Sequence, residues 1–403
     1  MRASVASVEQ IEQRYRYIIL GAGASGLSLC FYLLEHGVRD PILILDRKAA
    51  FTDDRTWCFW DIHPTPFTHL AAHCWHHWDV FEAGGQEAAQ MSPAVGYACL
   101  HSRDFYAHVL ETIHRCGNVT LALGCPTESC HSLPDHAAVQ AGGVVYQGDY
   151  IFDSRFRPAP EDDGALTQRF FGQFVRTEHP CFDPARCTLM DFRVSQADGL
   201  HFFYVLPFSP TEALVENTYI QDSRAGAIMP EQHRAEIAAY LTHQQGAAGY
   251  TVAREEAGAI PMTMRTFPKR DGRVFFIGTA GGCTKPSSGY TFTRIQAQCR
   301  QIAEAAAGGT LDRFQEQSAP PRYRFFDAVF LQALRDQPAA FPGYFQRLFA
   351  RVPPDALTSF LSESGTWHSD SKIIRSLPLV PFLRAALQAS LHIGRPSRGC
   401  GPG

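Results

Sequence analysis

The first fifty residues alternate between continuous apolar runs and one helical apolar stripe. Tyr15–Leu20 (YRYIIL) is long enough for a buried strand, and residues 25–36 carry apolar side chains at helical spacing. Gly37 is placed to end that helix, and Pro41–Asp46 (PILILD) is a second apolar run of strand length. Strand, helix and strand within about 30 residues predict a βαβ unit.

Further predicted strands and helices follow residue 50, separated by stretches without regular periodicity. An aromatic stretch without periodicity runs from residue 51 to residue 97, and a helical stripe follows at residues 103–116. Residues 201–208 and 214–220 are β-prone runs joined by SPTEA, which predicts a hairpin. A late strand at residues 273–278 leads through a glycine-rich loop into a helical segment at 292–307.

Three glycines follow the first predicted strand in the spacing G-x-G-x-x-G, at Gly21, Gly23 and Gly26. The first allows a tight turn, the second lets a pyrophosphate approach the backbone, and the third lets helix and strand pack closely. The helix N-terminus adds free N–H groups and a positive dipole. Asp46 lies 20 residues beyond Gly26, where it can accept a hydrogen bond from a ribose hydroxyl. The pattern predicts a dinucleotide site rather than an empty glycine turn.

The late segment Gly272–Gly282 (GRVFFIGTAGG) resembles the second motif of FAD-dependent enzymes. In those enzymes an aspartate contacts the flavin ribityl chain, whereas here Thr279 takes its place, and its hydroxyl can still donate to a ribityl or phosphate oxygen. The resemblance implies FAD, and an ordinary strand-to-helix turn is the alternative. The expected cofactor contacts are Gly21, Ala22, Gly23, Ser25, Gly26, Asp46, Arg55, Gly278, Thr279, Gly281, Gly282, Gly289 and Tyr290.

These elements predict an α/β protein with a Rossmann-type FAD-binding domain, an inserted β-sheet-rich substrate domain and a helical C-terminal region. The FAD-binding domain is expected to be discontinuous. Its expected segments are residues 14–50, 98–170 and 255–308, with residues 51–97 and 171–254 forming the β-rich region and residues 309–403 the helical one.

Composition narrows the class of protein. Hydrophobic residues make up 45% of the 403 residues and charged residues 19%, as in globular proteins. The net charge of −4 comes without long runs of like charge, so nucleic acid is not an expected partner. The start of the chain lacks the apolar core of a signal peptide, and no stretch has 18 uninterrupted apolar residues. We expect a cytoplasmic protein.

Four segments together resemble the lycopene cyclase family, a branch of the flavoproteins. They are Asp54–Asp61 (DRTWCFWD), Leu214–Ile220 (LVENTYI), Gly258–Met262 (GAIPM) and Ile277–Gln296, which contains TKPSSGYTF. The resemblance implies a lycopene β-cyclase, which closes the ψ end groups of lycopene into β-rings by way of γ-carotene. It also implies that FAD acts in its reduced form, with NAD(P)H as the reductant, in a reaction with no net redox change.

Glu216 resembles the catalytic glutamate of that family. Cyclisation needs an acid that protonates a terminal double bond and a base that removes a ring proton, and one carboxyl group can serve as both. On a strand, Glu216 shares a face with Leu214, Thr218 and Ile220. Such neighbours would raise its pKa, whereas a solvated strand carboxylate is the ordinary alternative. Glu256 and Asp61 are the next candidates for the acid.

Aromatic side chains near these motifs are suited to a cationic intermediate, because their faces attract positive charge. An extended segment sends alternate residues to opposite sides, so core packing is the alternative for each of them. The expected substrate pocket contains Trp57, Phe59, Trp60, Phe203, Tyr204, Ile260, Pro261 and Met262.

A histidine cluster raises the alternative of a metal site. On a helix, His69, His73, His76 and His77 would gather on one side, but no nearby carboxylate completes a ligand set convincingly. We therefore expect no metal.

Two C-terminal segments, FPGYFQRLFARV and LPLVPFLRAAL, place bulky apolar residues beside arginines. Because a C40 hydrocarbon dissolves in the bilayer, we expect peripheral association with the membrane lipid surface. Two rival functions remain: a monooxygenase or prenyl reductase of the same fold, and a prenyl- or lipid-binding protein without catalysis.

Overall fold

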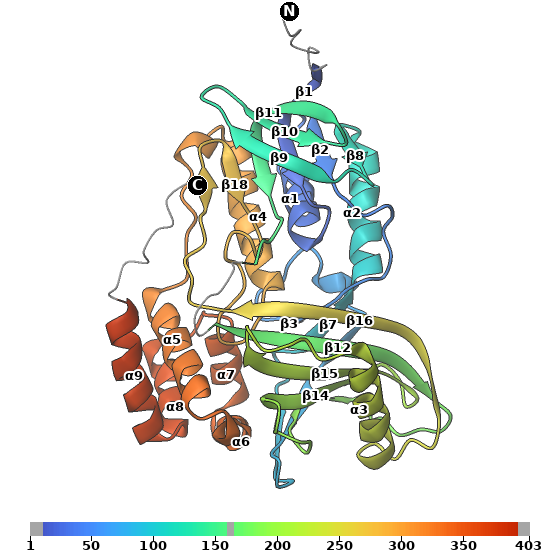
Figure 1. Cartoon of the computed structure of the whole chain (residues 1–403), viewed down its shortest axis with the longest axis vertical. Coiled ribbons are helices and arrows are strands. Elements are labelled where there is room, and N and C mark those ends of the chain that lie inside the picture. Colours follow the sequence, from blue (N-terminus) through green and yellow to red (C-terminus); the bar gives the residue numbers. More distant parts are fainter. Residues whose placement is uncertain (1–10, 159–164, 394–403) are drawn as a thin grey trace, which may run out of the picture.

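A computed structural model describes residues 11–158 and 165–393. The expectations for the N-terminal ten residues and for the tail at 394–403 lie outside the described residues. The chain forms a Rossmann-type domain, a large and mostly antiparallel second sheet and a group of C-terminal helices, in agreement with the predicted fold class. In Figure 1 the Rossmann-type domain is at the top, with the sheet and the helices side by side below it.

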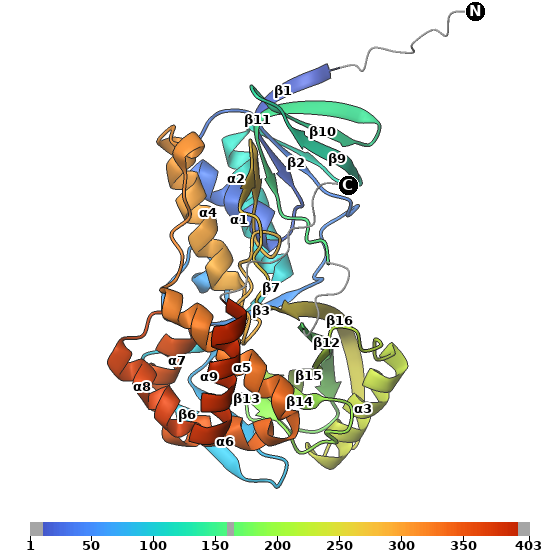
Figure 2. The same ribbon diagram turned by 60° about the vertical axis from the view of Figure 1, so that its left-hand side comes forward.

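The Rossmann-type domain is built on a parallel sheet in the order β18-β11-β1-β2-β8. Its strands are β1 (Ile11–Leu20), β2 (Ile42–Leu45), β8 (Val119–Ala122), β11 (Val144–Asp153) and β18 (Val274–Phe276). One face packs against α1 (Ala24–Glu35), α2 (Ser102–Cys116) and α4 (Phe292–Ala307). The other face packs against the hairpin of β9 (Thr127–Ser132) and β10 (Ala137–Ala141), while β17 (Arg270–Asp271) pairs with β18. The predicted βαβ unit is confirmed, and Figure 2 shows the three helices together on their side of the sheet.

The second sheet has seven strands in the order β16-β12-β15-β14-β13-β5-β6. They are β5 (His77–Phe81), β6 (Glu87–Met91), β12 (Leu166–Thr177), β13 (Arg186–Asp191), β14 (Leu200–Pro207), β15 (Glu212–Asp222) and β16 (Tyr250–Met262). Strands β14 and β15 pair antiparallel, which confirms the predicted hairpin. Because β12 and β16 lie wholly in this sheet, the expected domain boundaries at residues 170 and 255 are wrong by several residues.

Both faces of the seven-stranded sheet are covered. On one face, α3 (Pro230–His243) packs against side chains such as Phe203 and Val215. The opposite face, with Phe202 and Leu214, packs against the C-terminal helices. These are α5 (Pro321–Asp336), α6 (Phe341–Arg351), α7 (Pro354–Leu361), α8 (Trp367–Ser376) and α9 (Leu379–Ile393). None of the helices in the described ranges is long and apolar enough to cross a bilayer.

A small sheet of β3 (Thr56–Trp60), β7 (Tyr97–His101) and β4 (His73–Trp75) lies beside the junction of the two larger sheets. The helix that would have gathered the histidines is wrong, because their segment forms β4 and β5. His73 and His76 instead contact the backbone oxygens of Pro184 (3.0 Å) and Ser92 (2.9 Å). Trp75 of β4 and Trp78 and Val80 of β5 pack in the hydrophobic core.

Candidate active site

The first glycine loop forms an open cradle at the N-terminus of α1. Gly21 has φ +100°, and a Cβ on Gly26 would lie 1.9 Å from the carbonyl oxygen of Gly21. A Cβ on Gly23, by contrast, would have no atom of the described residues within 4 Å. No side chain in the described ranges caps α1, so its first N–H groups are available to a ligand. The cradle fits a pyrophosphate at a helix N-terminus.

Two further segments complete this cradle. Asp46, just after β2, accepts hydrogen bonds from the backbone N–H groups of Ala22 and Lys48, the latter at 2.7 Å. The late glycine loop touches the first one, because a Cβ on Gly278 would lie 1.9 Å from Oγ of Ser25. These contacts place the residues expected to hold FAD in one continuous surface.

A cavity of about 380 Å³ lies between this cradle and the seven-stranded sheet. Segments far apart in the sequence form its walls: the start of α1, strand β3, four strands of the sheet (β12, β14, β15 and β16) and the loop before α4. Among the predicted site residues that line it are Ser25, Arg55, Trp57, Tyr204, Glu216, Ile260, Thr279, Gly289 and Tyr290.

Glu216 projects into this cavity from β15, between β12 and β14. The hydroxyl of Thr218 donates to its Oε1 at 3.0 Å. Burial and, to a smaller extent, the negative charge of Glu256 together raise the pKa of Glu216 from 4.5 to about 8, against the opposing effect of the Thr218 hydrogen bond. A carboxyl group in this environment is mostly protonated at neutral pH.

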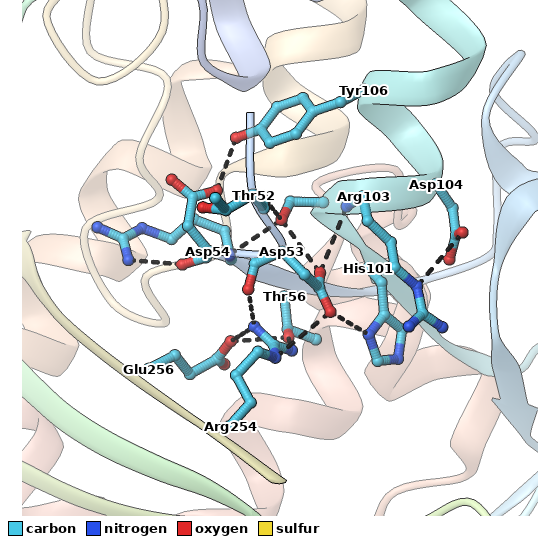
Figure 3. Close-up of polar contacts among 12 residues, drawn as sticks. Thr52, Asp53, Asp54, Thr56, His101, Arg103, Asp104, Tyr106, Arg254 and Glu256 are labelled. Carbon is cyan, nitrogen blue, oxygen red and sulfur yellow. Dashed lines mark hydrogen bonds and ion pairs between the residues drawn. The ribbon is translucent and has the colours of Figure 1, made fainter. Parts of the chain in front are cut away.

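Glu256 reaches the same cavity from β16. Its Oε2 accepts from the hydroxyl of Thr56 at 2.8 Å and from Nη1 of Arg254 at 3.0 Å (Figure 3). The same Nη1 donates to the carbonyl oxygen of Asp53 at 2.7 Å, and His101 contacts the Asp53 carboxylate at 3.4 Å. Burial raises the pKa of Glu256, whereas the charge of Arg254 opposes that rise. The network ties the segment before β3 to the edge of the sheet.

The expected pocket residues divide between the cavity and the cores. Trp57, Tyr204 and Ile260 line the cavity. Phe59 stacks on Phe292 in the core of the Rossmann-type domain, at 4.9 Å between ring centroids. Trp60 packs in another core at 4.7 Å from Trp78.

Phe203 is a correction, because it lies on the opposite face of the sheet. It stacks on Tyr240 of α3 at 4.1 Å between centroids and is fully buried there. Met262 belongs to the core beneath the C-terminal helices, and Pro261 and Asp61 lie outside the cavity lining. Tyr97 lines the cavity as well, although it was not among the predicted site residues.

Arg254 and Thr56 also belong to this site, although neither was among the predicted site residues. The charged triplet Arg254–Glu256, in an otherwise apolar strand segment, was the only sequence pattern that could have indicated these residues. Thr56, which donates to Glu256, lies 200 positions away in the sequence.

Solved structures with this fold include flavoproteins. The flavoprotein/dehydrogenase from Cytophaga hutchinsonii superposes with a TM-score of 0.61 at 11% identity, over 94% of this chain and 100% of that one. The p-nitrophenol 4-monooxygenase from Pseudomonas putida superposes with a TM-score of 0.58 at 12% identity, over 95% of this chain and 100% of that one. The fold is thus that of FAD-dependent oxidoreductases.

Sequence comparison identifies the family of the chain. The family model described as lycopene cyclase protein matches residues 17–387, so the chain belongs to the lycopene cyclase family. It is 25% identical to the lycopene beta-cyclase of Pantoea ananas over 401 residues, which cover 96% of this chain and 100% of that one. It is 26% identical to the lycopene beta-cyclase of a Paracoccus species over 309 residues, 72% of each chain.

Proposed function

We propose that this protein is a lycopene β-cyclase that converts the ψ end groups of lycopene to β-rings, with Glu216 as the catalytic acid. The observation that supports this most directly is a buried carboxyl group with a pKa of about 8 in a cavity beside two glycine loops of flavoprotein type. Protonating an alkene requires such a neutral acid in a site shielded from water.

In the proposed reaction, Glu216 donates its proton to the terminal double bond of lycopene. The neighbouring alkene attacks the resulting tertiary cation and closes the ring. The Glu216 carboxylate then takes a ring proton, so the acid is regenerated and the atoms of the substrate are unchanged in number. The faces of Trp57 and Tyr204 stabilise the cation, at about 0.5 to 2 kcal/mol each.

The residues present fit FAD. The Gly21–Gly26 loop and the N-terminus of α1 would hold its pyrophosphate, Asp46 its ribose, and Thr279 its ribityl chain. When bound, FAD reduced by NAD(P)H supplies negative charge near the developing cation, which explains a redox cofactor in an isomerisation.

Expression in a bacterium that accumulates lycopene tests this function. Conversion of the red pigment to β-carotene, by way of γ-carotene, is the expected result. A monooxygenase or prenyl reductase would instead consume one NAD(P)H for each product formed, and a lipid-binding protein would leave lycopene unchanged. The buried acid Glu216 favours the cyclase over both rivals.

We also propose that the protein is cytoplasmic and binds the membrane lipid surface through α8 and α9. Leucines at 379, 383, 387 and 391 recur along α9 and are exposed, as are Ile374 and Trp367 of α8. Exposed cations at Lys372, Arg375 and Arg384 lie beside them. An apolar helix face flanked by cations suits an interface with anionic lipid. The FPGYFQRLFARV segment does not contribute, because α6 packs Phe341 and Phe349 inward.

Sedimentation with anionic vesicles tests this surface. The double substitution of Leu387→Asp and Leu391→Asp is expected to lower the bound fraction at least tenfold. Leu133→Asp, at an exposed site of the Rossmann-type domain, is the matched control. Equal binding of all three proteins would rule this surface out.

A further inference from the structure

A second cavity, of about 260 Å³, lies between the seven-stranded sheet and the C-terminal helices. Its lining is almost entirely apolar and includes Phe202, Phe330, Phe345, Leu348 and Phe382. Asp327, a charged residue in the lining, is paired with Lys285 at 2.8 Å and accepts from Ser287. The cavity therefore suits a ligand without polar groups.

This apolar cavity adjoins the catalytic one. Gln168, Tyr204, Ser288 and Tyr290 line both, so these side chains form the wall between them. Glu216 lies on the far side of that wall, in the catalytic cavity. A chain that passed beside Tyr204 and Tyr290 would bring its end to the acid.

The other end of the apolar cavity reaches the protein surface where α8 meets α9. Ile374, Leu379 and Leu383 line the cavity and are also 52%, 68% and 53% exposed. They belong to the apolar face described above for membrane contact, and α9 lies at the outer edge of the helical region (Figure 1). The cavity thus opens within the surface that would face lipid.

The catalytic cavity is too small to hold the whole substrate. At about 380 Å³ it is near the lower end of ligand pockets, which span roughly 300–1,000 Å³. A flavin ring and one end group leave no room there for the remainder of a C40 chain.

We propose that the apolar cavity is the access channel and the binding site for the unreacted part of the carotenoid. The substrate leaves the bilayer end first between Ile374 and Leu383, and its end group passes Tyr204 and Tyr290 to reach Glu216. This inference rests on the proposed function, because it takes a linear hydrocarbon as the ligand.

Two tryptophan substitutions at exposed leucines test the channel. Leu383→Trp narrows its mouth, whereas Leu133→Trp adds the same side chain to the Rossmann-type domain, outside the cavity lining and the membrane surface. With lycopene in vesicles, kcat/KM is expected to fall at least tenfold for Leu383→Trp and to stay at the wild-type value for Leu133→Trp. Both variants should bind FAD and vesicles normally. Ala386→Phe, inside the channel, should repeat the loss if the indole introduced by Leu383→Trp turns outward.

Pigment binding separates this inference from the proposed function. Protein loaded from lycopene vesicles is re-isolated, and its carotenoid content is read by absorbance. Leu383→Trp and Ala386→Phe are expected to lose most of the pigment that wild type and Leu133→Trp retain. Wild type that binds lycopene without cyclising it would refute the proposed function and leave the channel standing. Equal pigment content in all four proteins, or co-isolated phospholipid in place of pigment, would refute the channel.

Discussion

Glu216 and Glu256 lie in register on either side of one residue, Gly172. Strands β15 and β16 both pair with β12, and Gly172 is the partner of Glu216 on one side and of Glu256 on the other. Because paired residues of adjacent strands point to the same face, both carboxyl groups face the catalytic cavity. A Cβ on Gly172 would lie 3.6 Å from Cβ of Glu216 and 3.4 Å from Cγ of Glu256. Glycine thus leaves the space between the two acids open.

Filling that space is predicted to impair catalysis. In Gly172→Ala, the added methyl group would lie 2.9 Å from Cδ1 of Leu214 and would displace the side chains beside it. We expect at least a tenfold loss of kcat with FAD binding retained, measured as β-carotene formed per enzyme. Gly84→Ala is the control, since its Cβ would have no atom of the described residues within 4 Å. Equal activity of both variants would show that this space is not used.

The charge of Glu256 is predicted to set the upper pH limit of activity. The acid must be protonated, so the rate of wild type should fall about tenfold per pH unit above pH 8. Glu256→Gln removes a negative charge that raises the pKa of Glu216, so this decline should begin at lower pH. Glu255→Gln, whose side chain pairs instead with Arg234 at 2.7 Å, should leave the profile unchanged. The measurement is kcat against pH for the three proteins.

Glu216 is also predicted to make stability depend on pH. Its pKa is about 8 when folded and 4.5 ordinarily, so between these values the folded protein keeps a proton that the unfolded chain has lost. The contribution of Glu216 to the free energy of unfolding is complete below pH 4.5 and falls by about 1.4 kcal/mol per unit up to pH 8. Relative to wild type, Glu216→Gln should therefore become more stable as pH rises. Urea titrations of both flavin-free proteins measure the free energy of unfolding at each pH. A difference between the two proteins that does not change with pH would contradict a raised pKa of Glu216.

Substitution of Gly23 is predicted to weaken FAD binding without affecting folding. A Cβ at this position would have no atom of the described residues within 4 Å, so Gly23→Ala should retain the melting temperature of the flavin-free protein. The same methyl group would stand where a pyrophosphate approaches the loop, so the dissociation constant for FAD should rise at least tenfold. Gly26→Ala, whose Cβ would lie 1.9 Å from a carbonyl oxygen, should instead lower the melting temperature. Isothermal titration and calorimetry measure the two effects.

Sequence patterns predicted the local elements better than the faces of the large sheet. The βαβ unit and the β14–β15 hairpin follow from apolar periodicity and glycine or proline turns, which are local signals. Alternation separates Phe203 from Tyr204 but does not say which of them meets the ligand. That strand is buried on both faces, by α3 and by the C-terminal helices, so its pattern has no polar side to orient it.

The ion pair of Arg254 with Glu256 could not be predicted from the sequence, for a different reason. Its position depends on Thr56 and Asp53, which come from the segment before β3, and only the tertiary fold brings them to the edge of the sheet. A helix at the histidines was only the condition for a metal site, and their spacing alone fits one. His73 and Trp75 instead lie in β4, and His77 and Trp78 lie in β5.

The most direct test of the account compares wild type with Glu216→Gln, each with reduced FAD and lycopene in vesicles, by chromatography of the pigments. Glutamine keeps the shape of the side chain and removes its acidic proton. The account predicts that wild type forms β-carotene while the variant binds FAD and lycopene normally and forms no ring product. Ring formation by Glu216→Gln at the wild-type rate would contradict it.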